Sequence, residues 1–147
     1  MTTESTLGEI ITKFNLRSDK NGAHSYCDYV YEHEFKKYKN KPITLLELGI
    51  WDCSSLRLWA EYFTDAKIYG IDKNPITQGK ELNLGCEFVC ENFNNITLIK
   101  ENGYQMSVLN TIPKLDIFID DASHDPKDQL FSIEYILPKM NPGSTFI

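Results

Sequence analysis

The hydrophobic positions of this chain fall into short apolar runs that are separated by longer amphipathic stretches. The first run is branched and ends in a glycine, Gly49, which is typical of a strand buried on both faces that leads into a tight turn. Four later runs, of three to six residues, have the same apolar character. The runs that predict strands are residues 43–46, 67–72, 96–99, 115–119 and, at the end of the chain, 145–147.

Helical spacing appears between these runs. Thr6 and Glu9 match a capping box that opens a short helix. Ser54 and Ser55 offer N-cap oxygens to a helix whose apolar positions are 56, 59 and 63. Residues 87–93 could be helical, and Asn141-Pro142-Gly143 predicts a turn. Two longer helices are predicted from apolar stripes: residues 23–38, with Cys27, Val30, Tyr31, Phe35 and Tyr38, and a helix beginning near Pro126, with Leu130, Ile133, Leu137 and Met140.

Alternation of strands and helices predicts an α/β fold with a parallel, doubly wound sheet. We expect one domain, in which residues 1–42 form an N-terminal helical segment and residues 43–147 form the sheet-bearing core. The sequence ends inside an apolar run, so we expect the last strands of such a fold to be absent. A second copy of the chain is one way to cover the sheet edge that this would expose.

Composition excludes some classes of function. The 147 residues carry a net charge of −6, which disfavours binding to nucleic acid or to an anionic membrane. No stretch approaches the ~18 apolar residues of a membrane span, and the first residues lack a secretory pattern, so we expect a cytoplasmic protein. We therefore expect Cys27, Cys53, Cys86 and Cys90 to be reduced, although the last two could also form a metal pair.

The first candidate ligand site lies where the first two strands end. Asp72 follows the glycine turn by about 20 residues, and a carboxylate at that place can accept hydrogen bonds from the hydroxyls of an adenosine ribose. The alternative is that Asp72 caps the turn at Asn74-Pro75. The dinucleotide fingerprint G-x-G-x-x-G is absent, and Trp51 would crowd a pyrophosphate, which disfavours a nicotinamide cofactor.

The second candidate site is the cluster of Asp120, Asp121 and His124 after the fourth run. Neighbouring residues of a strand point to opposite faces, so one of the two aspartates can share a pocket with the histidine. A carboxylate suits a divalent cation and a histidine suits proton abstraction. The alternative is a cap for the helix beginning near Pro126.

Five segments together carry a family resemblance. They are SDKNGAHSYCDYVYE (18–32), LLELGIWDCSSLRLWAEYF (45–63), IYGIDKNP (68–75), LDIFIDDASH (115–124) and LPKMNPGSTFI (137–147). Because these segments occur in this order, the chain resembles the class I S-adenosylmethionine-dependent methyltransferases. Within them, it resembles the macrolide-sugar O-methyltransferase and cephalosporin-hydroxylase-like group. The resemblance implies a Rossmann-like sheet of strand order 3-2-1-4-5 with helices on both faces.

The resemblance also implies a function: O-methylation of a hydroxyl on a small molecule or glycan, with S-adenosylmethionine as cofactor and possible assistance from Mg²⁺. It places Glu47 and Gly49 at the methionine end of the cofactor, Asp72 on the ribose and Asn102 near the adenine. Asp121 is implied as the Mg²⁺ ligand and His124 as the base. The implied cofactor-binding set is Glu47, Gly49, Ser55, Asp72, Asn102 and Asp120.

Two departures from the family pattern leave an alternative open. Cys53 stands where the family usually has a glycine in the cofactor loop. The family also has a Glu-Asp pair just after the strand that here reaches Ile147, and this sequence lacks it. The alternative function is a shortened, non-catalytic module that binds a nucleoside or a protein partner.

Overall fold

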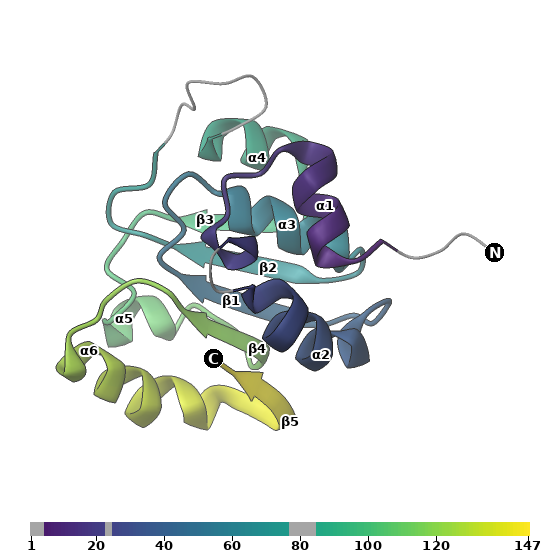
Figure 1. Cartoon of the computed structure of the whole chain (residues 1–147). Helices are drawn as coiled ribbons and strands as arrows, with labels where there is room; N and C mark the ends of the chain where they lie inside the picture. The colour runs from purple at the N-terminus through teal and green to yellow at the C-terminus, as the bar shows by residue number, and fades with distance from the viewer. Residues whose placement is uncertain (1–4, 23–24, 77–84) are drawn as a thin grey trace.

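The computed structural model describes residues 5–22, 25–76 and 85–147, and these form a five-stranded parallel sheet (Figure 1). The strand order is β3-β2-β1-β4-β5, which confirms the order implied by the family resemblance. The apolar runs became strands because each could be buried on both sides. The strands are β1 (Thr44–Leu48), β2 (Lys67–Ile71), β3 (Ile96–Ile99), β4 (Leu115–Asp120) and β5 (Met140–Phe146).

Strand β1 lies at the centre of the sheet, and its side chains alternate between two hydrophobic cores. Leu45 faces the first core, whereas Leu46 and Leu48 face the second. β1 pairs with β2 from Thr44 opposite Lys67, and with β4 on its other side from Leu45 opposite Ile117. The carboxyl ends of these three strands therefore lie at the same edge of the sheet.

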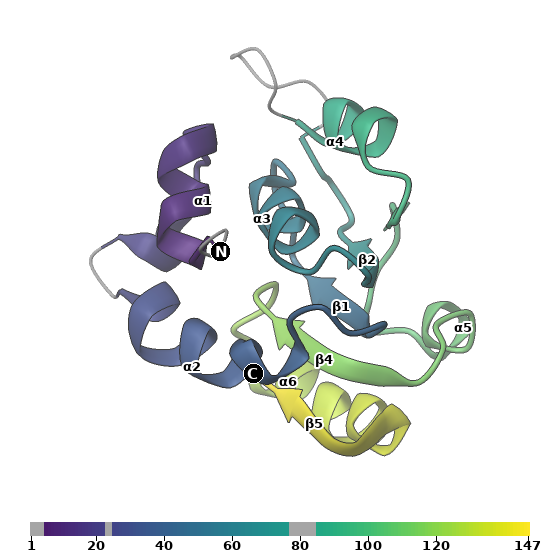
Figure 2. The ribbon, with the colours of Figure 1, turned by 90° about the vertical axis from the view of Figure 1, so that its right-hand side faces the viewer.

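The first core is covered by the N-terminal helices together with α3 and α4 (Figure 2). The predicted capping box is confirmed, because Thr6 accepts a hydrogen bond from the Glu9 amide and Glu9 accepts one from the Thr6 amide. Trp59 of α3 packs edge-on against Phe35, so residues of the N-terminal segment share one core with the sheet. The elements are α1 (Leu7–Phe14), η1 (Asp19–Asn21), η2 (Cys27–Tyr31), α2 (Glu32–Phe35), η3 (Lys36–Tyr38), α3 (Ser54–Tyr62) and α4 (Cys86–Asn92).

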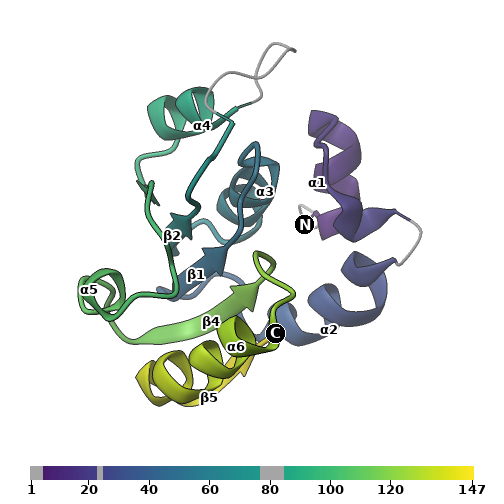
Figure 3. The same ribbon diagram turned by 90° about the vertical axis from the view of Figure 1, so that its left-hand side faces the viewer.

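The second core is covered on the opposite side by α5 and by the helix that starts at α6 (Figure 3). Helices on both faces make this a doubly wound sheet, as predicted. No helix in the described parts of the chain is long and apolar enough to cross a membrane. The elements here are α5 (Met106–Leu109), α6 (Pro126–Phe131), η4 (Ser132–Ile136) and η5 (Leu137–Lys139).

The predicted face of the helix beginning near Pro126 is wrong. Leu130, Ile133 and Leu137 lie on the solvent side, with 47% or more of each exposed, whereas Ser132 and Ile136 are buried. The hydroxyl of Ser132 donates a 2.7 Å hydrogen bond to Asp120 Oδ2, and this polar contact turns that face of the helix towards the sheet. In the earlier helix, the predicted start at residues 23–24 lies outside the described residues.

That earlier helix also contains an exposed residue from its predicted stripe. Val30 is exposed, whereas Cys27, Tyr31, Phe35 and Tyr38 are buried as predicted. The backbone over Cys27–Tyr31 is a π-helix, which has more residues per turn than the α-helical spacing assumed from the sequence. The wider turn shifts Val30 away from the core.

The predicted turn at Asn141-Pro142-Gly143 instead lies within β5 as an irregularity. Leu115 pairs with Met140 and Ile117 pairs with Thr145, so β5 contains extra residues opposite β4. Pro142 is tolerated because β5 is an edge strand, and Gly143 has a φ of +79°. The hydroxyl of Tyr38 donates to the Gly143 carbonyl at 3.1 Å and ties the N-terminal segment to this edge.

Candidate functional site

The candidate site is a crevice at the carboxyl ends of β1, β2 and β4. The amide of Gly49 donates to the Ile71 carbonyl, and the amide of Asp121 donates to the Leu48 carbonyl, each at 2.9 Å. These bonds continue the sheet pairing just past the strand ends. The loops that follow the three strands therefore start side by side, which is where ligands bind in open α/β sheets.

Gly49 is required at the start of the loop after β1. Its φ of +79° is in the left-handed region, and a Cβ added there would lie 2.6 Å from Ala122 Cα and still closer to the Asp121 carbonyl oxygen. The sequence argument placed a ligand against this glycine. The structure places the backbone of the loop after β4 there, so Gly49 permits two loops of the crevice to meet.

Asp72 lies at the end of β2 and holds the loop after β1. Its Oδ2 accepts hydrogen bonds from the amides of Ile50 at 3.0 Å and Trp51 at 3.1 Å. Its Oδ1 accepts from the Asn74 amide at 2.8 Å, which is the turn cap considered from the sequence. A carboxylate has about four lone-pair sites, so one remains for a ribose hydroxyl.

Asn102 and Asp120 both accept hydrogen bonds from Tyr104, which lines the crevice. Asn102 accepts a 3.2 Å hydrogen bond from the Tyr104 amide, and the Tyr104 hydroxyl donates to Asp120 Oδ1 at 2.5 Å. Burial and the hydrogen bond to Asp120 raise the pKa of Tyr104, so its hydroxyl stays protonated and acts as a donor. Because Tyr104 and Ser132 occupy both oxygens of Asp120, the contact of Asp120 with the cofactor stays a prediction.

A buried ion cluster consists of the buried Lys20 and Glu47 with the exposed Asp121, and Lys20 and Asp121 line a small hollow beside Gly49. Lys20, which is 4% exposed, places Nζ 2.6 Å from Asp121 Oδ2 and 3.4 Å from Glu47 Oε1. Burial acts to lower the pKa of Lys20, but the charges of Glu47 and Asp121 outweigh it and hold the pKa above its usual range. Burial raises the pKa of Glu47, while Lys20 and hydrogen bonds from Ser55 and Trp59 oppose that rise. Glu47 Oε2 accepts the indole N–H of Trp59 at 2.9 Å.

The remaining predicted residues take different places. Ser55 is buried and lines a small hollow beside Gly49 and Asp121. His124 is exposed on the loop after β4, three residues beyond Asp121. His124 lines none of the hollows described below, so its role as a base stays a prediction.

Two adjoining hollows open at the strand ends. The first has a volume of about 290 Å³ and is lined by Asn102, Gly103, Tyr104 and Ser123 among others. The second has a volume of about 420 Å³ and is lined by Arg17, Asp19, Trp51 and Asp121 among others. Both are also lined by Gly49, Asp72 and Asn74. Their volumes fall near the ~300–1,000 Å³ of small-molecule sites, so the residues present fit an adenosyl ligand laid across Gly49.

The residues present fit a metal ion less well than they fit an adenosyl ligand. Within the described part of the chain, no three side chains of the His, Cys, Asp and Glu types are grouped to hold one. Asp121 has one oxygen bound to Lys20. Divalent cations of this kind need several oxygen ligands.

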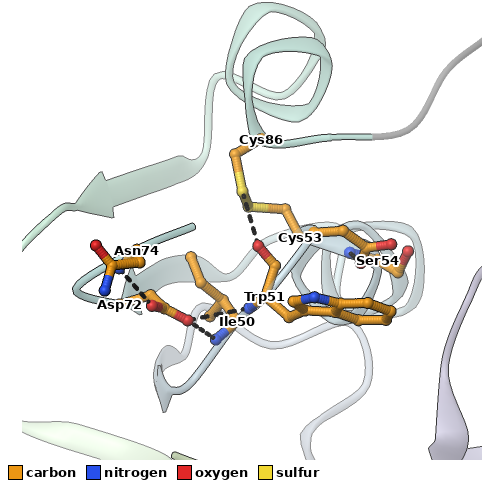
Figure 4. Close-up of a disulfide and its surroundings, with 8 residues drawn as sticks. Ile50, Trp51, Cys53, Ser54, Asp72, Asn74 and Cys86 are labelled. Atoms are coloured by element: carbon orange, nitrogen blue, oxygen red, sulfur yellow. Dashed lines mark hydrogen bonds between the residues drawn. A yellow bond between two sulfur atoms is a disulfide. The ribbon is translucent and has the colours of Figure 1, made fainter. Parts of the chain in front are cut away.

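The loop after β1 is linked covalently to the chain beyond β2. Cys53 and Cys86 form a disulfide, which corrects the expectation that both thiols are reduced (Figure 4). The two residues are 33 positions apart, and their Cα atoms are brought to 5.1 Å by the packing of α3 beside α4. The considered Cys86–Cys90 metal pair is excluded by this bond, and Cys90 is an exposed free thiol.

Comparisons with known proteins show which proteins this chain is similar to. No family model matches the chain. The chain is 26% identical over 140 residues to the 8-demethyl-8-alpha-L-rhamnosyl tetracenomycin-C 2'-O-methyltransferase of Streptomyces olivaceus, covering 88% of this chain and 34% of that protein. It is 27% identical over 128 residues to the mycinamicin VI 2''-O-methyltransferase of Micromonospora griseorubida, and this match covers 80% of this chain and 29% of that protein.

Solved structures decide the fold. The MycE methyltransferase of the mycinamycin biosynthetic pathway, in complex with Mg and SAH, matches 99% of this chain and 37% of its own with a TM-score of 0.77 at 24% identity. This chain has the class I methyltransferase fold. Its curated relatives are sugar O-methyltransferases, and it spans about a third of their length. A second MycE structure, with Mg, SAH and mycinamycin VI, matches with a TM-score of 0.75 at 24% identity and covers 99% of this chain and 39% of its own.

Three residues of this methyltransferase fold were missed from the sequence. Lys20 was included in a polar turn, although it lies in one of the family-like segments. Tyr104 follows Asn102-Gly103 in a region that matches the family poorly, so no pattern pointed to it. Trp59 was assigned to the core, which is correct, but its indole N–H also satisfies the buried Glu47.

Proposed function

We propose that the protein is an S-adenosylmethionine-dependent O-methyltransferase that acts on a hydroxyl, and specifically on a hydroxyl of a sugar. The observation that carries the proposal is the pair of hollows that share Gly49 and Asp72 at the ends of β1 and β2. The curated relatives support the reaction class, because their names are those of O-methyltransferases and two of these names include a rhamnosyl group.

Each site residue then has a role. Asp72 accepts hydrogen bonds from the ribose while it holds the loop after β1. Asn102 lies near the adenine, and Glu47, Gly49 and Ser55 border the methionine end. When bound, the cofactor supplies a methyl group on a cationic sulfur.

Removing the proton of the acceptor hydroxyl is the main chemical task of the protein's own residues. His124 takes the proton of the acceptor hydroxyl as its oxygen bonds to the methyl carbon and the carbon–sulfur bond breaks. The products are a methyl ether and S-adenosylhomocysteine. Alignment and one base suffice for such a reaction, since positioning alone supplies much of the rate.

Magnesium assistance is proposed because the MycE complexes contain Mg. Within this chain Asp121 is the residue that would contribute to such a site. The described residues supply no three-ligand group, so no step of the reaction is assigned to the metal.

Calorimetric titration with S-adenosylmethionine, with and without Mg²⁺, tests the proposal. We expect binding in at least one condition, and a larger heat or tighter binding with Mg²⁺ would support a metal role. Absence of binding in both conditions would exclude the enzyme. Methyl transfer from labelled cofactor to rhamnosyl and other deoxysugar glycosides would then identify the acceptor.

A non-catalytic nucleoside-binding module is the second candidate function. The observation that favours it is the pairing of Asp121 with Lys20, which engages the carboxylate that a metal would use. This module would bind the cofactor without any turnover. A cytoplasmic location and self-association across the edge strand β5 also stay predictions, and cell fractionation and size-exclusion chromatography would test them.

A further inference from the structure

The Cys53–Cys86 disulfide lies at the edge of the proposed cofactor crevice. Cys53 is the last residue of the loop after β1, directly before α3, and Cys86 is the first residue of α4. Both are at most 1% exposed. The bond therefore links the loop that begins at Gly49 to the chain that follows Asp72.

The two loops are also joined by hydrogen bonds on either side of Trp51 (Figure 4). The Trp51 amide donates to Asp72 at 3.1 Å, and the Trp51 carbonyl accepts from the Ile76 amide at 2.7 Å. The amide of Cys86 in turn donates to the Ile76 carbonyl at 3.1 Å. Asp72 thus holds one side of the loop, and the disulfide closes the other.

The backbone of this loop needs such restraint. Gly49, Trp51 and Cys53 have φ values of +79°, +44° and +62°. Residues other than glycine adopt the left-handed region only where the surrounding structure enforces it. Trp51 and Cys53 are two such residues within three positions. We therefore expect the backbone of this loop to relax when one of its restraints is removed.

Relaxation of this loop would change the crevice. Gly49, Trp51, Asp72 and Asn74 all line the larger hollow, and 57% of Trp51 is exposed there. The amides of Ile50 and Trp51 fix the orientation of the Asp72 carboxylate. A ligand that needs Asp72 in this orientation would bind the restrained loop more tightly, since less ordering is left for binding to supply.

We propose that the Cys53–Cys86 disulfide is a positioning element for the cofactor site, so that the oxidised chain binds an adenosyl cofactor more tightly than the reduced chain. This inference rests on the proposed function. Reduction by dithiothreitol would break the sulfur–sulfur bond and form two thiols, while dithiothreitol is oxidised to its cyclic disulfide. In a compartment that keeps thiols reduced, the chain would therefore be in its weaker-binding form, and oxidation would raise its cofactor affinity.

Calorimetry with S-adenosylhomocysteine tests the proposal on the oxidised protein, the reduced protein, and the variants Cys53→Ser and Cys86→Ser. We expect affinity to fall by about tenfold or more on reduction and in both variants. Reoxidation should restore the affinity of the reduced, unmodified protein but not that of Cys53→Ser or Cys86→Ser. Cys90→Ser is the matched control, because this exposed free cysteine should leave both the affinity and its redox dependence unchanged.

Amide hydrogen exchange provides a measurement that does not depend on the ligand. Reduction should speed exchange at Ile50 and Trp51 while the amides of β4 stay protected. If the reduced protein keeps both its affinity and its slow exchange at these amides, the disulfide does not position the site, and the proposed function is unaffected. If the oxidised protein binds no cofactor, both the proposed function and this inference are overturned.

Discussion

Replacing Lys20 with methionine tests the buried ion cluster most directly. The substitution keeps a long apolar side chain but removes the charge that faces Glu47, which is 0% exposed. Breaking one partner of a buried pair costs roughly 3–5 kcal/mol. The exposed Asp121, with 44% of its side chain accessible, adds at most about 1 kcal/mol. A loss of this size is a large part of the ~5–15 kcal/mol that stabilises a typical domain.

The loss should depend on pH, and its sign follows from Glu47. Burial already raises the pKa of Glu47 above its ordinary value of 4.5, and removing Lys20 raises it further. When the pKa of a carboxyl is higher in the folded state than in the unfolded state, its contribution to stability is fully present at pH values below the unfolded-state pKa. This contribution is lost as the pH rises through the folded-state pKa. Lys20→Met should therefore lose more stability at pH 8 than at pH 5.

Urea unfolding at both pH values measures this effect. Lys37→Met is the matched control, because Lys37 pairs with Glu34 at 3.8 Å with both side chains largely exposed, and we expect a change below about 1 kcal/mol. Adding Glu47→Gln to Lys20→Met should recover part of the loss at pH 8. A loss under about 1 kcal/mol at pH 8, or an equal loss at both pH values, would refute the role given to Lys20.

Three further substitutions test the site itself. Asp72→Ala should weaken cofactor binding by about 1.5–3 kcal/mol in calorimetry, and unchanged affinity would refute its contact with the ribose. His124→Ala should slow turnover on the order of 10²–10⁴-fold with cofactor affinity intact, and full activity would remove it as the base. Gly49→Val should abolish cofactor binding, because the added side chain overlaps Ala122; a folded variant that still binds would contradict the placement of this loop.

The sheet was predictable because local pattern and global topology agree in it. Apolar runs such as residues 43–46 can be buried only between two layers of helices, and the family-like segments then fixed the strand order. The capping box at Thr6 was predictable for the same reason, since its two hydrogen bonds are local. The individual strands and the capping box depend on residues that lie within a few positions of one another, whereas the strand order came from the family resemblance.

What the sequence missed depends on distant partners. Nothing near Lys20 shows that it will be buried against Glu47, and nothing near Cys53 shows that Cys86 will lie beside it. The outward stripe of Leu130 was misassigned because the helix is oriented by Ser132, whose partner Asp120 lies on another element. Periodicity identifies a helix, but a polar contact selected the face.

The link between Lys20 and Asp121 spans 101 positions of the chain. A nascent chain that has completed β1 and β2 already contains Gly49 and Asp72. It does not yet contain Asp121, the residue after β4 that pairs with the Lys20 ammonium group. Contacts of such long range slow folding, because a long loop must be closed before they can form. The complete crevice therefore needs residues from distant parts of the sequence, because a polypeptide that stops before β4 lacks both Asp121 and the loop that meets Gly49.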